Sequence, residues 1–349
     1  LLRYQEKLTA GMLARGYERD FADALCRQIQ GFGSYGFPES HAASFALLVY
    51  VSAWLKCFEP AAFLCGLLNS QPMGFYGPSQ LIQDARRHGV EVLPVDVQTS
   101  DWACTLEPAP AAAGRPAARL GLRLVKGFNP EAAERIAKAR RSGAFASVDE
   151  LARRARLSSA ELRTLASAGA LASLAGHRHR AWWAAAGSQA APGMLHDAPI
   201  PDTMPTLPAP AATQDLMADY ARLGFSLGRH PLSFLRGLLS AERFLSAAEI
   251  ADCPDRKLAR GAGIVTCRQR PGTAKGTMFV TLEDETGWVN VIVRPDLLEA
   301  ERRILLGARL LGIYGQIARQ GSVVHLHAKR VVDRSALLGH LATRSRDFH

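Results

Sequence analysis

The chain has 349 residues, a formal net charge of +10 and a composition of 48% hydrophobic and 21% charged residues. This composition supplies ordinary buried cores and excludes a chain that is disordered throughout, and the length allows two or three domains. The longest uncharged apolar stretch, residues 42–55, is shorter than the roughly 20 residues that a membrane-spanning helix needs. Neither a signal peptide nor a CxxC pair occurs, so we expect a cytoplasmic protein with reduced cysteines and no membrane partner.

The positive charge is concentrated in two separate parts of the chain. Residues 119–180 carry a net charge of +8 and residues 257–349 carry +7, whereas the segments before and between them are net negative. Because neutralising phosphates releases counterions, two basic blocks divided by an acidic stretch favour nucleic acid as the partner. At this point, solvated charge on helix faces is the alternative explanation.

The first two thirds of the chain predict mainly helices, with Ser40 placed to cap one helix and Pro60 to begin the next. Proline, glycine and alanine clusters predict the breaks between them. The expected elements in chain order are helices within 1–70 including one over 41–57, a helix over 78–88, an apolar run over 90–97, a surface loop over 108–118, helices over 119–186, a Pro/Ala-rich linker over 187–213 and a helical patch over 214–250.

From Gly261 the hydrophobic period changes from about 3.6 residues to about 2. A helix-like segment over 295–306 lies between the third and fourth of the expected strands, which is the order of an OB-fold barrel. The fold class is therefore predicted as multidomain α+β, mostly helical and followed by a five-stranded OB-fold β-barrel. The expected strands are residues 264–268, 278–282, 289–293, 309–318 and 323–332.

The run LRLVKGFNPEAAERI over 122–136 predicts a helix-hairpin-helix, with a first helix ending at Lys126 and a second beginning at Pro130. Hairpin amides and a helix N-terminus can together hold a backbone phosphate of duplex DNA. A weaker second copy over 148–171 is explained equally well as a plain helical hairpin. The candidate DNA contacts of the first copy are Lys126, Gly127, Phe128, Asn129, Arg140 and Arg141.

Barrels of the expected type bind single strands with a basic groove and aromatic platforms. The glycine-rich loop over 268–276 is basic, and we expect Phe279 in the next strand to belong to the core. His325 and His327 share one face of a strand but lack a third metal ligand, so we interpret them as lining residues. The candidate DNA contacts of the barrel are Arg268, Arg270, Lys275, Trp288, Arg294 and Lys329.

The segment GSYGFPESHAASF over 33–45 runs from an aromatic and glycine-rich loop into a capped helix. Its first turn presents Ser40 and His41, and a helix N-terminus with a hydroxyl and an imidazole suits a phosphate or a sugar hydroxyl. Taken alone, one capped helix with a histidine is usually structural.

Several runs, taken in order, resemble bacterial C-family DNA polymerases of the polymerase III alpha type. They are YGFPESHAASFAL at 35–47, AWLK at 53–56, PAAF at 60–63, VLPVDV at 92–97 and, after the hairpin, GFSLGRHPL at 224–232. Pro38 and Glu39 replace the Asn-Lys that the replicative form usually has, and the chain ends soon after the barrel. Both features favour the error-prone subgroup, often called ImuC, with this chain as its C-terminal part.

The resemblance implies nucleotidyl transfer, in which a primer 3′-hydroxyl attacks a deoxynucleotide with Mg²⁺ held by aspartates of a palm domain. No matching Asp-x-Asp element occurs here, so we predict that this chain binds no metal, holds no catalytic residue and does not polymerise alone. Tyr35, Phe37, Ser40 and His41 would lie near the incoming nucleotide. The implied partners are primed template DNA, single-stranded template, deoxynucleotides, mutasome proteins and, indirectly, the sliding clamp.

With this resemblance, five domains are expected. Two alternatives remain: a fragment of the replicative alpha subunit, and a non-enzymatic DNA-binding adaptor built from the same modules. A more distant one, an RNA-binding barrel protein, leaves the fingers-like segment unexplained. The expected domains are the C-terminal part of the polymerase fingers over 1–101, helix-hairpin-helix over 102–186, a Pro/Ala-rich linker and helical connector over 187–256, OB-fold over 257–335 and a tail over 336–349.

Overall fold

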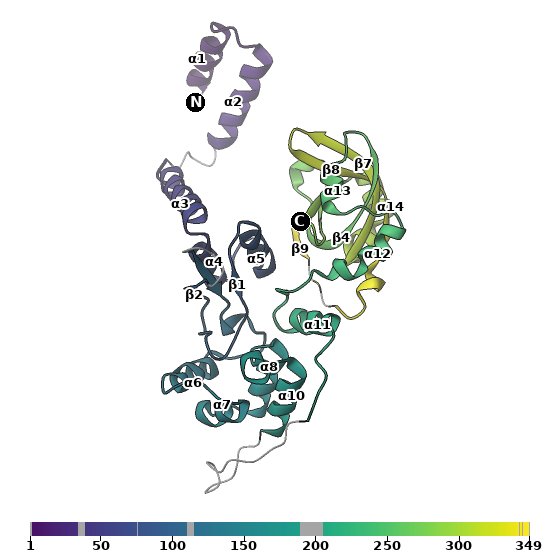
Figure 1. The fold of residues 1–349 in the computed structure, drawn as a ribbon. Helices are drawn as coiled ribbons and strands as arrows, with labels where there is room; N and C mark the ends of the chain where they lie inside the picture. Colours follow the sequence, from purple (N-terminus) through teal and green to yellow (C-terminus); the bar gives the residue numbers. More distant parts are fainter. Residues whose placement is uncertain are drawn as a thin grey trace. The chain divides into compact units, whose positions relative to one another are not determined.

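The structure is a computed structural model, which describes residues 2–33, 39–74, 76–109, 115–188, 205–341, 343 and 345–348. The chain divides into two compact units, Leu1–Phe63 and Leu64–His349, which are treated separately below (Figure 1). Within the described residues, we find no helix whose length and apolarity would suffice to cross a membrane.

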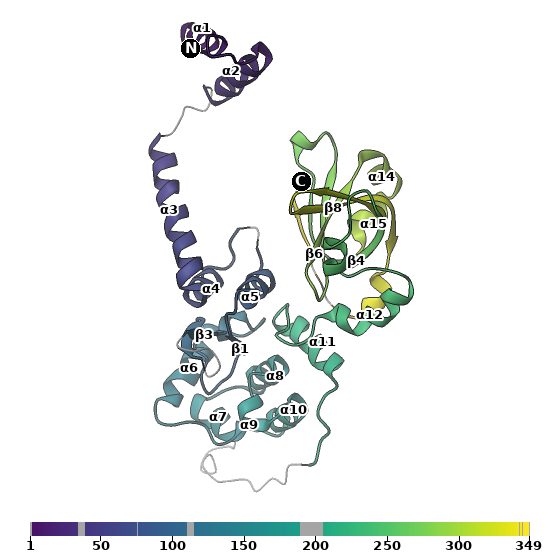
Figure 2. The same ribbon diagram turned by 45° about the horizontal axis from the view of Figure 1, so that its top comes forward.

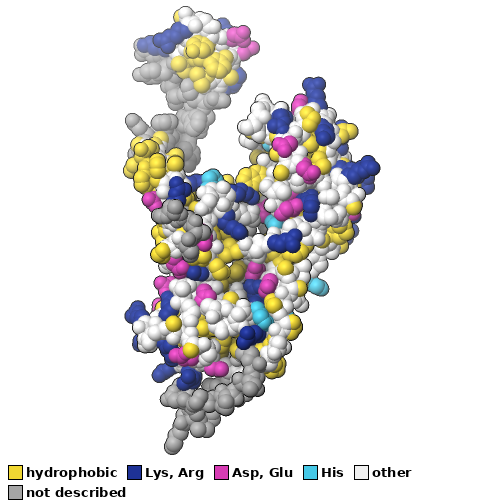
Figure 3. Space-filling model, viewed as in Figure 1, with side chains coloured by type: hydrophobic (Ala, Val, Ile, Leu, Met, Phe, Trp, Pro, Cys, Tyr) yellow, Lys and Arg dark blue, Asp and Glu magenta, His cyan; other side chains and the backbone are white. Residues whose placement is uncertain are grey.

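The first unit is helical, as expected, and contains α1 (Leu2–Leu13), α2 (Arg19–Gly33) and α3 (Glu39–Phe58). Helices α1 and α2 pack together and bury Cys26, whose Sγ lies 3.4 Å from the Thr9 hydroxyl. In contrast, α3 is apolar on all sides and exposes a row of large hydrophobic side chains (Figure 3). These are Phe45, Leu47, Leu48, Val49, Tyr50, Val51, Trp54 and Phe58.

The second unit begins within α4 (Pro60–Asn69) and continues with α5 (Pro78–Arg87) and a small sheet. The sheet has the order β1 (Val92–Leu93), β3 (Pro116–Arg119) and β2 (Thr105–Pro108), with β1 parallel and β2 antiparallel to β3. The surface loop expected over 108–118 is therefore wrong at both ends, which are paired strands. The alanines of β3 explain the error, because Ala117 and Ala118 are buried and their small side chains fit a crowded sheet.

Helices α6 (Pro130–Arg140), α7 (Val148–Ala155), α8 (Ser159–Ala168), α9 (Ala172–Ala175) and α10 (Arg178–Gly187) follow and pack as one group (Figure 1). The helix expected to end at Lys126 is wrong, since only a 3-10 turn, η1 (Leu122–Leu124), precedes the hairpin. The amides of Leu122 and Arg123 donate to the carbonyls of Asp101 and Trp102 instead of to a preceding helical turn.

A helical connector leads to the barrel through α11 (Ala212–Arg222), α12 (Pro231–Ala241) and α13 (Ala247–Ala251). Most of the linker expected over 187–213 lies outside the described residues. Arg178 of α10 forms ion pairs with Asp215 and Asp219, and these pairs attach α11 to the hairpin helices.

The barrel confirms the OB-fold expectation (Figure 2). Its strands run in the closed order β5-β6-β8-β7-β4, with β4 also paired to β5; only the β6–β8 pair is parallel among these. A short strand, β9 (Arg346–Phe348), adds to β4 in parallel. The barrel elements are β4 (Leu258–Gln269), η3 (Gly272–Ala274), β5 (Met278–Glu283), β6 (Trp288–Val293), α14 (Pro295–Ala300), α15 (Arg302–Gly307), β7 (Leu310–Gln320), β8 (Val323–Asp333) and η4 (Ser335–Leu338).

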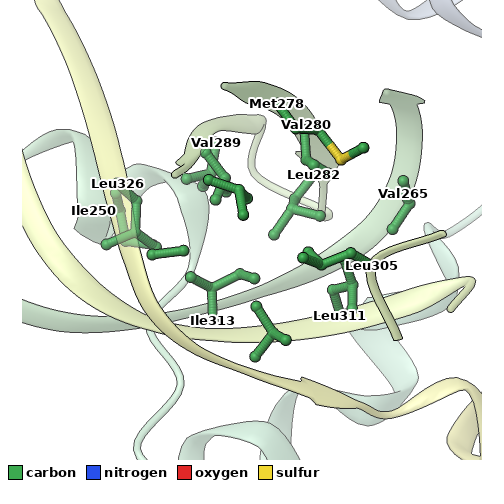
Figure 4. Close-up of a cluster of buried hydrophobic side chains, with 14 of the residues drawn as sticks. Ile250, Val265, Met278, Val280, Leu282, Val289, Leu305, Leu311, Ile313 and Leu326 are labelled. Carbon is green, nitrogen blue, oxygen red and sulfur yellow. The ribbon is translucent and has the colours of Figure 1, made fainter. Parts of the chain in front are cut away.

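Apolar side chains from these strands point toward one another inside the barrel (Figure 4). Strand alternation places Met278, Val280 and Leu282 in this core. Phe279 lies between them in sequence and therefore on the outer face, where it is half-buried. The expectation that Phe279 belongs to the core is wrong, because a strand has only two faces and its inner one is already filled.

Candidate nucleic-acid interface

From Gly127 onward, the first hairpin has the backbone that its sequence predicts. Gly127 adopts φ +79°, a left-handed conformation that glycine takes without steric cost. Phe128 then turns into the core, and Asn129 caps α6 by accepting from the Ala132 amide at 2.7 Å. Pro130 occupies the first helical position, where a missing N–H costs nothing.

The second hairpin repeats this arrangement at matching positions. Arg156 takes the left-handed conformation, Leu157 is buried, and Ser158 caps α8 by accepting from the Glu161 amide at 3.2 Å. The second turn therefore shares the backbone conformation, burial and cap of the first hairpin, and its DNA-binding role stays a prediction.

One carboxylate joins the two hairpins. Glu161 accepts from the Ser158 amide at 2.7 Å, from Arg135 at 2.8 Å and from the Asn129 amide group at 3.4 Å. Burial alone would raise the pKa of Glu161, but the hydrogen bonds from Ser158 and Arg135 outweigh it and hold that pKa below its ordinary value. The N-terminus of α8 thus already carries a negative charge, which disfavours a phosphate at the same place.

Several of the hairpin candidates make contacts within the chain. Lys126 donates from its ammonium to the Tyr220 carbonyl at 3.3 Å and from its amide to Arg222 at 2.8 Å, at the end of α11. Arg140 donates to the carbonyls of Val97 and Ser100 and pairs with Asp101 at 2.5 Å. The DNA-binding role of these residues stays a prediction, and the side chains of Lys126, Phe128 and Arg140 make contacts within the chain.

Other cations of this block remain exposed. They lie at the end of α6, on α7 and α8, and at the second hairpin. They are Lys138, Arg141, Arg153, Arg156 and Arg163.

The outer face of the barrel gathers residues from β5, β6 and β8. Phe279 lies opposite Ile292, which is the neighbour of His327. In the next row Thr281 lies opposite Asn290, which is the neighbour of His325. Trp288, opposite Glu283, continues the face at the start of β6 and is 54% exposed.

Exposed cations lie on the loop and strands next to this face. Arg270 and Lys275, from the loop between β4 and β5, are exposed, as is Lys329 on β8. Arg294 at the end of β6 is also exposed, and its ion pair with Asp296 at 3.6 Å is the solvated kind that contributes little.

Arg268 lies apart from these cations. It pairs with Val280 on the inner face of the barrel and is only 5% exposed. Its guanidinium donates to the carbonyls of Leu305 and Ala308, at the end of α15, at 2.7 and 2.6 Å. Alternation along β4 explains this placement, because Cys267 and Gln269 take the outer positions.

The two histidines of the outer face differ in their surroundings. Burial, then the nearby charges of His325 and Arg294, lower the pKa of His327. The Nδ1 atom of His325 is buried and has no hydrogen-bond partner within the described part of the chain. The sequence predicts these histidines as lining residues and Phe279 as a core residue. The alternation of Thr281 with the buried residues of β5 is the sequence pattern that could have indicated this outer face.

The structure describes only part of the residues that were predicted to lie near the incoming nucleotide. Tyr35 and Phe37 lie outside the described residues, while Ser40 and His41 fall in the first turn of α3 and their side chains are not described. Among described residues, no three His, Cys, Asp or Glu side chains come together as metal ligands. The donor set for the implied Mg²⁺ is therefore not found among the described residues.

Comparison with known proteins places these elements in a family. Residues 89–181, which contain both hairpins, match the family model described as helix-hairpin-helix motif. The error-prone DNA polymerase of Aromatoleum aromaticum is 67% identical over 350 residues, covering 100% of this chain and 33% of that protein. The error-prone DNA polymerase of Azoarcus sp. is 62% identical over 350 residues, covering 99% of this chain and 33% of that protein.

Solved structures give much weaker matches. Asparaginyl-tRNA synthetase from Pyrococcus horikoshii is 20% identical, with a TM-score of 0.21, over 26% of this chain and 22% of that one, and supports no inference. The curated relatives show the family of this chain. The chain spans about one third of their length. Over its own whole length, this chain belongs to the family of bacterial error-prone DNA polymerases.

Proposed function

We propose that this chain is the part of an error-prone DNA polymerase that holds the template, within a whole protein that performs DNA-templated nucleotidyl transfer during damage-induced mutagenesis. The observation that carries the proposal is the outer face of the barrel, where aromatic, imidazole and aliphatic side chains lie on strands that, with the loop before them, also carry exposed cations. Single-strand binding needs this combination, since bases stack on flat side chains while cations follow the phosphates.

On the barrel, Trp288 and Phe279 offer ring faces to unpaired bases, and His327 adds a third flat group. Arg270, Lys275, Arg294 and Lys329 lie where phosphates of the same strand would pass. Arg268 is left out, because its donors already bind carbonyls inside the barrel. Binding of this kind tolerates any base sequence, as a template-holding surface requires.

The hairpins would hold duplex DNA behind the reaction site. Their turns are self-capped, so the contacts fall to the exposed cations at the end of α6 and around the second hairpin. Arg141, Arg156 and Arg163 are the residues we would expect to meet backbone phosphates. Such contacts position the protein on the duplex and carry no base specificity.

The remaining roles belong to the whole protein. Tyr35, Phe37, Ser40 and His41 would lie near the incoming deoxynucleotide, and Mg²⁺ would be bound by a palm domain outside this chain. The partners would be primed DNA, mutasome proteins and, through them, the sliding clamp, in the cytoplasm. Upstream palm aspartates would distinguish this proposal from the non-enzymatic adaptor.

The test is a titration of the purified protein against fluorescent single-stranded, duplex and primed DNA over a salt series, with RNA of the same length as control. We expect steep negative log–log salt slopes for both DNA forms. Arg270→Glu should weaken single-strand binding severalfold while sparing duplex, and Arg163→Glu should do the reverse. Equal losses on both ligands, or no binding at low salt, would contradict two separate surfaces.

A further inference from the structure

Helix α5 meets the barrel through two pairs of residues. Gln83 and Arg87 are four positions apart and share one face of α5. Glu283 and Trp288 lie directly opposite each other on β5 and β6. Each helix residue contacts one strand residue, so the two pairs fit together as a unit.

Glu283 holds α5 and the barrel together. Its buried carboxylate accepts from the Gln83 amide group at 2.8 Å and from His230 Nε2 at 3.3 Å. His230 is held in turn, because its Nδ1 accepts from the Leu232 amide at 3.2 Å as the cap of α12. Three elements, α5, α12 and β5, therefore converge on one carboxylate, and α5 cannot shift along the barrel without breaking these bonds.

Arg87 uses this fixed position to reach Trp288. Its guanidinium carbon lies 4.4 Å from the centre of the indole ring, within cation–π range. The same guanidinium donates to Gln83 at 3.2 Å, which limits its freedom to move away. Trp288 nevertheless stays 54% exposed, so the guanidinium over its ring leaves about half of the residue accessible to a ligand.

We propose that Arg87 is a positioning residue for single-strand binding, which holds the Trp288 indole so that an unpaired base stacks on the open face. The inference rests on the proposed function of the barrel face. It adds a residue from α5, far from the barrel in sequence, to a site that barrel-type proteins build from their own strands and loops. The bound state would contain a guanidinium–indole–base stack, in which the held ring needs no ordering when the base arrives.

Arg87 could instead compete with the base for the indole. The contacts of Arg87 favour cooperation, because a base and Arg87 can use opposite ring faces at the same time. Arg87 is also attached to α5 by Gln83 and faces the negative charge of Glu283, which both favour its present position.

The experiment is a double-mutant cycle on the whole protein, with single-stranded oligonucleotide affinity as the readout. Arg87→Ala should weaken binding by about three- to tenfold, and Trp288→Ala by about fivefold or more. In the Trp288→Ala background, Arg87→Ala should have almost no further effect, because the ring it positions is gone. Arg86→Ala is the matched control, since Arg86 is the neighbouring arginine and donates to the Leu227 carbonyl, not to the ring.

The salt dependence gives an independent readout. A positioning residue does not neutralise a phosphate, so Arg87→Gln should lower affinity without changing the log–log salt slope. Thermal unfolding of each variant would show that it is folded.

The failures are distinguishable. If Trp288→Ala leaves affinity unchanged, the proposed barrel site itself fails. If Trp288→Ala weakens binding but Arg87→Ala is neutral, strengthens it, or weakens it equally in both backgrounds, only the positioning role is overturned.

Discussion

The two basic blocks of this chain differ in what surrounds their exposed cations, although each block also places some cations in internal contacts. In the hairpin region, Arg135 and Arg154 donate to carboxylates or carbonyls of neighbouring helices, and Arg140 donates to carbonyls of the segment before β2. On the barrel, Arg270 and Lys275 remain exposed beside a face of aromatic and imidazole side chains. The net charge of a segment therefore counts cations but does not say how many are available to a ligand.

The physical reason why some cations make internal contacts is that certain carbonyls lack a backbone partner. Short helices leave carbonyls without partners at each end, and arginines from neighbouring helices satisfy them. Arg154, for example, donates to the Gly143 carbonyl at 2.7 Å, just beyond the end of α6. Barrel strands satisfy most of their own backbone, so barrel arginines that make internal contacts reach carbonyls outside the strands, as Arg319 does at Cys253 and Arg309 at Leu341.

The strongest test of this distinction is the pair Arg268 and Arg270, two positions apart at the end of β4. Arg268→Ala should lower the free energy of unfolding by about 3 kcal/mol, because a buried guanidinium and its carbonyl partners are lost. Arg270→Ala should change stability by no more than about 0.5 kcal/mol, and should instead reduce the single-strand salt slope by about 0.7. Urea denaturation and anisotropy titrations measure the two effects. A stable Arg268→Ala protein with weakened DNA binding would contradict the structural role of Arg268.

The hairpin region offers a matched pair in Arg140 and Arg141. Arg140→Ala should cost about 1–2 kcal/mol of stability, since three oxygen partners are lost at a partly exposed position. Arg141 is exposed, so Arg141→Ala should leave stability within about 0.5 kcal/mol and weaken duplex binding severalfold. Both variants are measured by denaturation and by duplex titration. If the two arginines affect duplex binding equally, the hairpin cations are not divided as the structure divides them.

Much of this fold could be predicted from local patterns. Alternating apolar residues gave all five barrel strands, and Asn129 with Pro130 placed the start of α6 correctly. The absence of the first helix of the hairpin could not be predicted. That helix is prevented because the carbonyls of Asp101 and Trp102 accept from the amides that it would have used. Arrangements set by residues distant in sequence leave no local signal.

The site shows the same division. Exposed cations of the barrel loop could be recognised from composition, whereas Arg268 could not be separated from Arg270 without knowing which strand face is buried. Arg87 had no signal at all, since its partner Trp288 is contributed by a strand far along the chain. Phe279 is the intermediate case, in which the alternation with Val280 was visible but could be assigned to either face.

The smallest expected effect concerns the protonation of His327, which would add a positive charge to the barrel face only at acidic pH. Because burial and the charges of His325 and Arg294 lower the pKa of His327, its imidazole is neutral at neutral pH, and the native state binds its proton less readily than the unfolded chain does.

Stability contributed by neutral His327 should therefore be present above the ordinary histidine pKa of about 6.5 and be lost as pH falls below it. Phosphates of a bound strand have the opposite effect, since they favour the imidazolium, so single-strand affinity should rise by about two- to fivefold as the pH falls toward 5.5. In His327→Gln, both the loss of stability and the gain of affinity should be reduced relative to the unchanged protein, with denaturation and anisotropy measured at each pH. The opposite signs are the discriminating feature, because general acid destabilisation would weaken folding and binding together. Parallel losses of stability and affinity would remove His327 from the strand-binding face and leave Trp288, Phe279 and the loop cations to account for it.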